Sequence, residues 1–551
     1  MPGRQPDRGQ QGHPRSHRPG PPFAPPRVSG LVFWLAAALL AATGLYHARA
    51  FCHDDAFITL RYVHRLVTGH GLTWNEGEHV EGFTHPLWLG QVALLHGFDL
   101  DPVAVVRALG LAYVAAIFLL WWRARVRLAP LLLVATQPGL LLWARSGLET
   151  ASFCFWMMAG AYLALGASER ARAGDARATR TAALTGAAFA AAALTRPEGF
   201  GAGLIALLWI SRAKRPRVLL AAAALLVVPL AAYGLFRLAY FGDVLPNTAR
   251  AKIGGLHLGT QLQLGWFYLA SQWTSWLPGT AGAAIALALT GSARSMWIVA
   301  LSLPVWISLF AGGGDYMPGA RLVIPATVLA AFAVAISRRP GTRRSHVALI
   351  VLCAGAVWQA GTALTQLAER DAALTVGEPI GRYLEAHLPA GAVVATATAG
   401  STPYYAPSLR FIDTLGLNDR EIARRKIVSI ETGGQSAPGH AKGDGAYVLR
   451  RTPDVIILGP AEGYLGQDPR TWFLTDFELL SSREFRERYR PYQFPVSVSP
   501  EEVAQPPLAR MADTSRRFVP LTAYLRIGSV AAERLSSLGR PMVPPGSSPP
   551  R

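Results

Sequence analysis

Residues 28–62, VSGLVFWLAAALLAATGLYHARAFCHDDAFITLRY, join two unlike kinds of sequence. The part up to Tyr46 is almost wholly apolar and is long enough to cross most of a bilayer. The part from His53 carries two adjacent carboxylates and the spacing of an amphipathic helix, which can lie in the membrane interface. An apolar run that ends in a charged helix is typical of a membrane protein with functional groups at the bilayer surface.

Apolar runs of this kind recur along two thirds of the chain. Only 16% of the residues are charged, against about 25% in soluble domains. Several runs are shorter than the roughly 20 residues of a straight crossing, and the pair flanking Thr195–Pro197 could be re-entrant. With the first run, the sequence predicts about eleven spans, the later ones near 102–122, 128–144, 150–167, 181–195, 198–211, 217–238, 277–291, 296–311, 322–336 and 346–366.

The connections between the runs fall into two classes. Every second connection is rich in arginine, and the positive-inside rule assigns that face to the cytoplasm together with the N-terminal tail. The other connections hold Gly, Pro and mixed charges, so we expect them to be extracytoplasmic with the C-terminal domain. Those connections are HDDAFITLRY (53–62), RSGLET (145–150), TRPEG (195–199), YFGDVLPNTARAK (240–252) and GGDYMPGAR (313–321).

The two ends of the chain differ in composition from the apolar middle. Residues 1–27 are rich in Pro, Gly and Arg and predict a disordered basic cytoplasmic tail. This leader, the first apolar run and Ala-Arg-Ala (48–50) could form a cleaved signal, but the run exceeds the ~7–15 residues of a signal core, which favours an uncleaved span. Residues 369–535 alternate short helical and β-rich patterns, and the Pro/Ser-rich residues 536–551 predict a disordered tail.

The fold class predicted is therefore mostly α. A polytopic transmembrane helix bundle (28–368) precedes a C-terminal soluble α/β domain (369–535) on the extracytoplasmic side of the plasma membrane. The net charge of +19 would suggest nucleic acid on a soluble protein, but the cations sit in loops between spans, so no nucleic acid is expected. Three scattered cysteines predict no disulfide framework.

Asp54 and Asp55 are the candidate catalytic residues. Adjacent helical residues diverge by about 100°, so the two carboxylates cannot aim at one point. One of them is expected to cap the helix, which leaves the other as a base, and we favour Asp54. The same loop supplies Arg61, Glu81 and His85 as candidate substrate-binding residues.

The remaining candidate binding residues come from the other connections on the same face and from the C-terminal domain. Cations there suit a phosphate group, and carboxylates suit proton abstraction from a sugar hydroxyl. The structural alternative is local pairing, Glu149 with Arg145 and Glu198 with Arg196. The candidates are Glu149, Arg196, Glu198, Asp243, Asn247, Lys252, Asp315, Arg321, Asp413, His440 and Asp444.

No cofactor is assigned. Asp54 and Asp315 could lie near a divalent cation, but no set of ligands has the spacing that would require one, so no metal site is predicted.

Six stretches resemble GT-C glycosyltransferases akin to the terminal arabinofuranosyltransferases of the mycobacterial cell wall. They are DDAFITLRYVHRLVTGHGLTWNEGEHVEGFTHPLW (54–88), TRPEG (195–199), GDVLPNTARAK (242–252), GGDYMPGAR (313–321), FIDTLGLND (411–419) and PGHAKGDGAYVL (438–449). The resemblance implies a polyprenyl-phosphate-linked sugar donor, a cell-envelope glycan or lipid acceptor, and inversion at the anomeric carbon. It also implies a first-loop acid, Asp54 or Asp55, as the base.

Two other functions remain open from the sequence. A transporter or flippase of a lipid-linked precursor would place ionisable residues near the bilayer midplane, whereas here they gather at the ends of the spans. A non-catalytic scaffold would have lost the first-loop carboxylates, and both are present.

Overall fold

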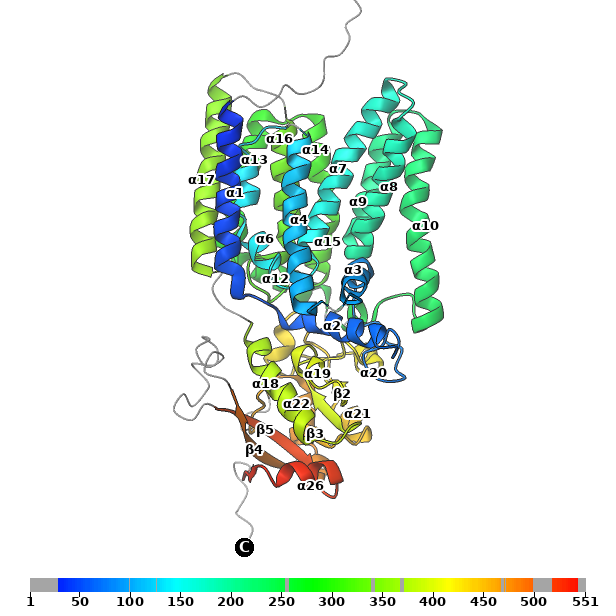
Figure 1. Cartoon of the computed structure of the whole chain (residues 1–551), viewed down its shortest axis with the longest axis vertical. Coiled ribbons are helices and arrows are strands. Elements are labelled where there is room, and N and C mark those ends of the chain that lie inside the picture. The colour runs from blue at the N-terminus through cyan, green and yellow to red at the C-terminus, as the bar shows by residue number, and fades with distance from the viewer. Residues whose placement is uncertain are drawn as a thin grey trace, which may run out of the picture.

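The computed structural model describes residues 28–98, 100–124, 126–252, 257–337, 342–366, 371–466, 470, 472–498 and 518–543. A tall helical bundle carries a smaller C-terminal domain, from Asp371 onward, at one end (Figure 1). The tail predicted at 1–27 lies outside the described residues, as does the end of the tail predicted at 536–551. Arg540–Pro541 of that second tail form a short strand, β6.

The bundle helices follow the predicted apolar runs, except for α12 (Leu258–Ser271), which no predicted run covers. They are α1 (Val28–His47), α4 (Pro102–Ala124), α5 (Leu131–Ala135), α6 (Pro138–Trp143), α7 (Thr150–Arg172), α8 (Ala178–Thr195), α9 (Glu198–Ser211), α10 (Pro216–Phe241), α12 (Leu258–Ser271), α13 (Trp273–Thr290), α14 (Ala293–Ala300), α15 (Leu303–Ala311), α16 (Ile324–Ile336) and α17 (Thr342–Gln366).

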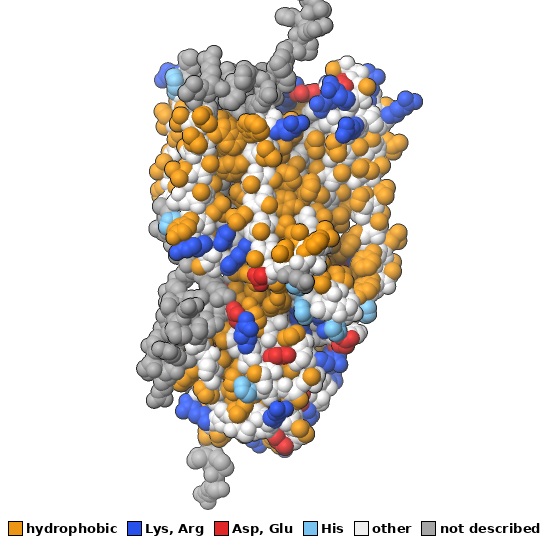
Figure 2. Space-filling model, in the orientation of Figure 1, with side chains coloured by type: hydrophobic (Ala, Val, Ile, Leu, Met, Phe, Trp, Pro, Cys, Tyr) orange, Lys and Arg blue, Asp and Glu red, His pale blue; other side chains and the backbone are white. Residues whose placement is uncertain are grey.

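The count of eleven spans is not confirmed. Within the described ranges, four segments are long and apolar enough to cross a membrane, namely α4, α7, α10 and Ala293–Ala311, with α1 and α2 (Asp54–Val67) forming one bent pair. The run predicted at 128–144 is two short helices, because Pro138 removes a backbone donor and ends α5 before α6 begins. Exposed apolar side chains cover the bundle's flank (Figure 2), as expected for a membrane protein.

The arginine-rich connections lie together at the end of the bundle opposite the C-terminal domain, where Lys and Arg side chains gather in Figure 2. Arg294, in the first turn of α14, pairs with Glu169 near the end of α7 at 2.6 Å. Arg127 donates to the Ser337 carbonyl beyond α16 at 3.1 Å. The two classes of connection that differ in sequence therefore occupy opposite ends of the bundle (Figure 1).

Helix α2 lies across the other end of the bundle, between it and the C-terminal domain (Figure 1). It packs against α3 (Pro86–His96) and against α19 (Ser401–Tyr404) of the C-terminal domain. The sequence placed one of the aspartates at its N-cap, and this is wrong. His53 is the N-cap, and its ring accepts a hydrogen bond from the Asp55 amide, so both aspartates lie in the first turn.

The C-terminal domain is built on one mixed six-stranded sheet of order β2-β1-β3-β5-β4-β6. The predicted strand segments form the parallel half: β1 (Val393–Thr396), β2 (Arg410–Asp413) and β3 (Val455–Ile456). A long antiparallel hairpin, β4 (Tyr489–Ser497) and β5 (Phe518–Arg526), continues the sheet. Helix α18 (Ala372–His387) covers the predicted amphipathic segment.

Arg61 ties α2 to the C-terminal domain. Its buried guanidinium donates to the carbonyl oxygens of Pro403, Ala406 (3.4 Å) and Leu409 (3.1 Å), and to that of Trp74 at 2.8 Å. Asn247, at the start of α11 (Asn247–Lys252), makes a second tie, because its amide donates to the carbonyls of Gly416, Leu417 and Asp419. Both residues, expected to bind substrate, join the two parts of the molecule.

We predict that Arg61→Lys lowers the stability of the full chain in detergent by about 3 kcal/mol or more, because one ammonium cannot reach all four buried carbonyls. Differential scanning fluorimetry would measure this loss, and limited proteolysis should cut faster between α17 and α18. The matched control is Arg410→Lys, which changes an exposed arginine whose partner is Glu78. Equal melting temperatures for the two variants would contradict the tie.

Candidate active site

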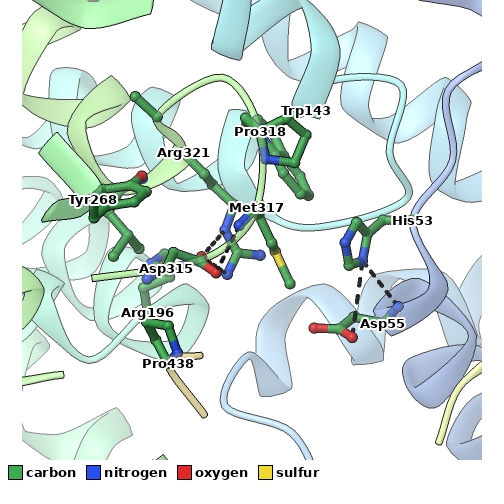
Figure 3. Close-up of polar contacts among 12 residues, drawn as sticks. His53, Asp55, Trp143, Arg196, Tyr268, Asp315, Met317, Pro318, Arg321 and Pro438 are labelled. Carbon is green, nitrogen blue, oxygen red and sulfur yellow. Dashed lines mark hydrogen bonds and ion pairs between the residues drawn. The ribbon is translucent and has the colours of Figure 1, made fainter. Parts of the chain in front are cut away.

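The loop between α15 and α16 forms the centre of the site (Figure 3). Arg321 donates to one oxygen of the Asp315 carboxylate, Oδ2, through both Nε (3.1 Å) and Nη2 (2.7 Å), and both side chains are buried. The Arg321 guanidinium also lies 4.9 Å from the centre of the Trp143 ring. Gly314 has φ +83° and its α-carbon faces Tyr268 so closely that a β-carbon would collide with that ring. The GGDYMPGAR sequence therefore fixes this pair through its loop geometry.

A second buried ion-pair network lies beside the first. Arg196, after α8, donates to Glu149 at 3.0 Å and to Glu198 at 3.2 Å. His85 lies 3.6 Å from the other Glu149 oxygen and 2.7 Å from the Thr59 hydroxyl. Burial alone would raise the pKa of Glu149, but His85 and Arg196 lower it to about 2. The expected Glu198–Arg196 pair is thus present, whereas the expected Glu149–Arg145 pair is wrong because Arg196 reaches Glu149 from a different connection.

Asp55 is the least engaged carboxylate of the site. Its side chain is 25% exposed, and among the described residues it accepts no hydrogen bond; the nearest basic nitrogen is His53 Nδ1 at 3.9 Å, which accepts the Asp55 amide and so has no proton to donate. Figure 3 shows it projecting from the start of α2 toward the side that holds Arg321 and Met317. The negative charge of the Asp55 carboxylate also acts electrostatically on Tyr316 and His440. This carboxylate therefore has both free acceptor sites and access to solvent.

Asp54 points the other way, into the C-terminal domain. Its carboxylate accepts from the Ser401 amide at 2.8 Å, from the Ser401 hydroxyl and from the Gly400 amide at 3.1 Å. Its own amide donates to Asp371, which caps α18. Burial, and then the neighbouring Asp371, raise the pKa of the Asp54 carboxyl. Asp54 is thus an anchor between α2 and the C-terminal domain.

The C-terminal domain reaches the site through His440. The His440 ring meets the Tyr316 ring edge-on at 4.8 Å and stacks on Phe473. Tyr316 lies between His440 and His53, yet it is 49% exposed. Lys252, at the end of α11, is exposed beside Gly439, and no described residue forms an ion pair or hydrogen bond with its ammonium.

The other predicted site residues hold the fold together. Glu81 accepts from Tyr233 and Arg237 of α10 at 2.5 and 2.6 Å. Asp243 pairs with Arg250 and with Arg424 of the C-terminal domain. Asp444 caps α21 (Gly445–Arg450). Asp413 accepts from the Leu415, Gly416 and Asn418 amides and the Asn418 side chain, which closes the turn after β2.

Three contributors were missed by the sequence reasoning. Trp143 and Asp371 are isolated in sequence, one at the end of a short helix and one at the start of α18, and no local signal distinguishes them. Tyr316 stands inside GGDYMPGAR and could have been noted there. Within the described residues, no three His, Cys, Asp or Glu side chains converge as a metal site, and Asp54 and Asp315 are both engaged by donors.

The sequence of the chain is similar to the sequences of two curated proteins. The terminal β-(1→2)-arabinofuranosyltransferase of Corynebacterium glutamicum is 28% identical over 386 residues, which cover 60% of this chain and 55% of that protein. The Mycobacterium tuberculosis protein of the same name is 31% identical over 283 residues, covering 46% and 43%. The chain is similar in sequence to these arabinofuranosyltransferases. It spans about half the length of the curated relatives it matches.

The fold also has a counterpart among solved structures. The crystal structure of ArnT from Cupriavidus metallidurans bound to undecaprenyl phosphate matches with a TM-score of 0.50 and 13% identity, over 73% of this chain and 90% of ArnT. The resemblance to GT-C proteins predicted from the motifs is therefore confirmed at the level of fold and relationship. Residues 365–500 match a sequence family described as "Domain of unknown function (DUF8728)".

We predict opposite pH effects for two aspartates of the C-terminal domain, the buried Asp413 and the half-buried Asp454. Burial raises the pKa of Asp413 to about 6, so its ionisation costs the folded state stability as pH rises from about 4 to 6, by roughly 3 kcal/mol. Relative to Asp413→Asn, the wild-type chain should lose melting temperature across this window and then level off.

The control is Asp454→Asn. Although burial opposes it, hydrogen bonds from Ser529, the Val393 amide and Arg526 lower the pKa of Asp454, so wild type should gain stability over this variant as pH rises toward 4 and above. Melting curves at several pH values would check both signs. Parallel curves for the two variants would show that the environments of the carboxylates are misassigned.

Proposed function

We propose that the chain is a membrane glycosyltransferase that moves a sugar, with arabinofuranose as the first candidate, from a polyprenyl-phosphate donor to a cell-envelope glycan or lipid. The names of the two relatives support the reaction class and the sugar. The shared fold with ArnT, which was crystallised with undecaprenyl phosphate, supports a lipid-phosphate donor. We also propose that the end of the bundle carrying α2 and the C-terminal domain is extracytoplasmic, since the opposite end holds the arginine-rich connections.

The observation that carries the proposal is the unengaged Asp55 carboxylate among buried ion pairs at the junction with the C-terminal domain. In the reaction, an acceptor hydroxyl oxygen attacks the anomeric carbon of the donor. The bond from that carbon to the phosphate oxygen breaks, and the hydroxyl proton passes to Asp55 as general base. Attack opposite the departing phosphate inverts the anomeric centre, and polyprenyl phosphate leaves.

Asp55 suits the base role better than Asp54, which the sequence favoured. A base must be within reach of the acceptor and must hold a free lone pair. The oxygens of Asp54 are occupied by Gly400 and Ser401, whereas those of Asp55 face the site. His53, which accepts the Asp55 amide, positions the first turn of the helix.

Three cations are candidates to hold the donor phosphate, and their surroundings differ. The charge of Arg321 is neutralised by an ion pair with Asp315, and the charge of Arg196 by ion pairs with Glu149 and Glu198. Lys252 is close enough to interact with Asp315, but no described carboxylate forms an ion pair with it. Lys252 is therefore the cation best able to add net attraction for a phosphate, while Arg321 and Arg196 supply oriented donors.

We predict that Asp55→Asn reduces sugar transfer by about 10²–10⁴-fold, the usual contribution of a general base, with little change in melting temperature. Asp54→Asn should retain measurable transfer but melt earlier, since Asn cannot accept from both Gly400 and Ser401 as the carboxylate does. The assay follows labelled sugar from a panel of polyprenyl-phosphate donors to glycan acceptors, using purified full-length protein.

If Asp54→Asn loses transfer while Asp55→Asn keeps it, the roles are reversed. If wild type transfers no sugar but moves lipid-linked sugar across proteoliposome membranes, the transporter alternative replaces the enzyme.

Lys252→Gln should raise the KM for the donor about tenfold with little change in kcat, because a charge that attracts the phosphate in ground and transition states alike contributes uniform binding. The matched control is Lys426→Gln, an exposed lysine of the C-terminal domain. A fall in kcat at unchanged KM would instead place Lys252 in the chemical step.

A further inference from the structure

A cavity of about 260 Å³ opens between the C-terminal half of α2 and the segment after α19. Four basic side chains line it from one side, Arg61, His64, Arg65 and His70, and Tyr404 and Ser408 line it from the C-terminal domain. At the ~1.5 Å rise per residue of a helix, His64 is roughly 13 Å along α2 from Asp55. The cavity is therefore distinct from the candidate active site, although the same helix serves both.

The cavity wall is basic, although Glu76 pairs with Arg65 and Glu385 is close enough to interact with Arg61. None of its lining residues is acidic. The Arg61 guanidinium donates to carbonyl oxygens only. Arg65 pairs with Glu76 through Nη2 and with Thr73 through Nε, which leaves its Nη1 without a partner in the described part of the chain.

The histidines add free donors and acceptors. The His64 ring makes no hydrogen bond with any described residue, and His70 is bonded through Nδ1 alone, to Thr68. Burial, then the basic groups His96, Arg61, His70 and Arg65, lower the pKa of His64. Basic residues in the last turn of a helix can simply complement its dipole. That explanation covers His64 and Arg65 but leaves out Arg61, one turn earlier, and His70, beyond the helix.

The position of the cavity indicates the source of an anion. The last turn of α2 exposes Leu66 and Val67, and the neighbouring α3 region exposes Leu94 and Phe98. Figure 2 shows histidine side chains at this level, where the apolar flank of the bundle gives way to the mixed surface of the C-terminal domain. Cations beside exposed apolar residues at such a boundary match the phosphate and acyl-chain regions of a bilayer leaflet.

We propose that this cavity binds the phosphate of an anionic phospholipid head group, with its acyl chains along the apolar flank beside Leu66 and Val67. The volume is below the about 300–1,000 Å³ of typical small-molecule pockets, which suits a head group and excludes a whole lipid-linked sugar. A bound head group would contact α2 and the C-terminal domain together through His64, Arg65 and Ser408. The bound lipid would thus join α2 to the C-terminal domain, in addition to the hydrogen bonds that Arg61 makes between them.

The test uses purified full-length chain, delipidated and then titrated with phosphatidylglycerol or phosphatidylcholine, with retained lipids counted by native mass spectrometry. Wild type should retain phosphatidylglycerol about tenfold more tightly than the double variant His64→Gln/His70→Gln. The matched control is His79→Gln/His346→Gln, exposed histidines outside the cavity, which should bind like wild type. Melting curves verify that each variant is folded.

A second variant guards against misfolding of the first. Ser408 is exposed on the C-terminal domain side of the cavity, so Ser408→Glu should fold and should weaken phosphatidylglycerol binding by a similar factor, because its carboxylate competes for the same cations.

Three results would overturn the proposal. They are equal retention of both lipids by wild type, unchanged retention in both cavity variants, or binding of inorganic phosphate that phosphatidylglycerol does not displace. The last would assign the cavity to a free anion. The lipid-binding assay does not measure sugar transfer. A negative result would therefore refute the lipid site without bearing on the proposed glycosyltransferase activity.

Discussion

The buried guanidinium of Arg61 is the contact on which the junction depends. A charged side chain can be buried only if its donors are satisfied, and here the acceptors are backbone carbonyls from two distant parts of the chain. Meeting that requirement fixes α2 against the C-terminal domain along its middle turn. Once α2 is fixed, the direction of every side chain in its first turn is decided as well.

That geometry explains why two adjacent aspartates do different work. Neighbouring positions on a helix diverge by about 100°, and α2 has protein on both of its long sides. Asp54 consequently meets the Gly400–Ser401 amides, and Asp55 meets the space beside the Asp315–Arg321 pair. The divergence could be predicted from the sequence. The choice between the two could not, because the donors to the Asp54 carboxylate lie more than 340 residues away.

Features that depend on neighbouring residues could be predicted from the sequence, whereas contacts between distant segments could not. The apolar runs predicted the bundle helices, and three short β-rich segments predicted the parallel half of the sheet, since both signals are local. Length was a weaker guide, and α5 and α6 show how one proline divides an apolar run. Pairing within one motif, Glu198 with Arg196, was predictable. The Glu149–Arg196 and Asp243–Arg424 pairs join separate connections, and only the folded chain brings them together.

The isolated charge of Lys252 has a consequence for the end of a catalytic cycle. In the proposed reaction the donor is a phosphodiester with one negative charge, whereas the departing polyprenyl phosphate is a monoester that carries about 1.5 to 2 charges near neutral pH. An ammonium without a partner therefore attracts the spent carrier more strongly than the fresh one. The spent carrier must therefore leave against a stronger attraction than the one that bound the donor, and the surrounding leaflet takes part in product release by taking up the lipid.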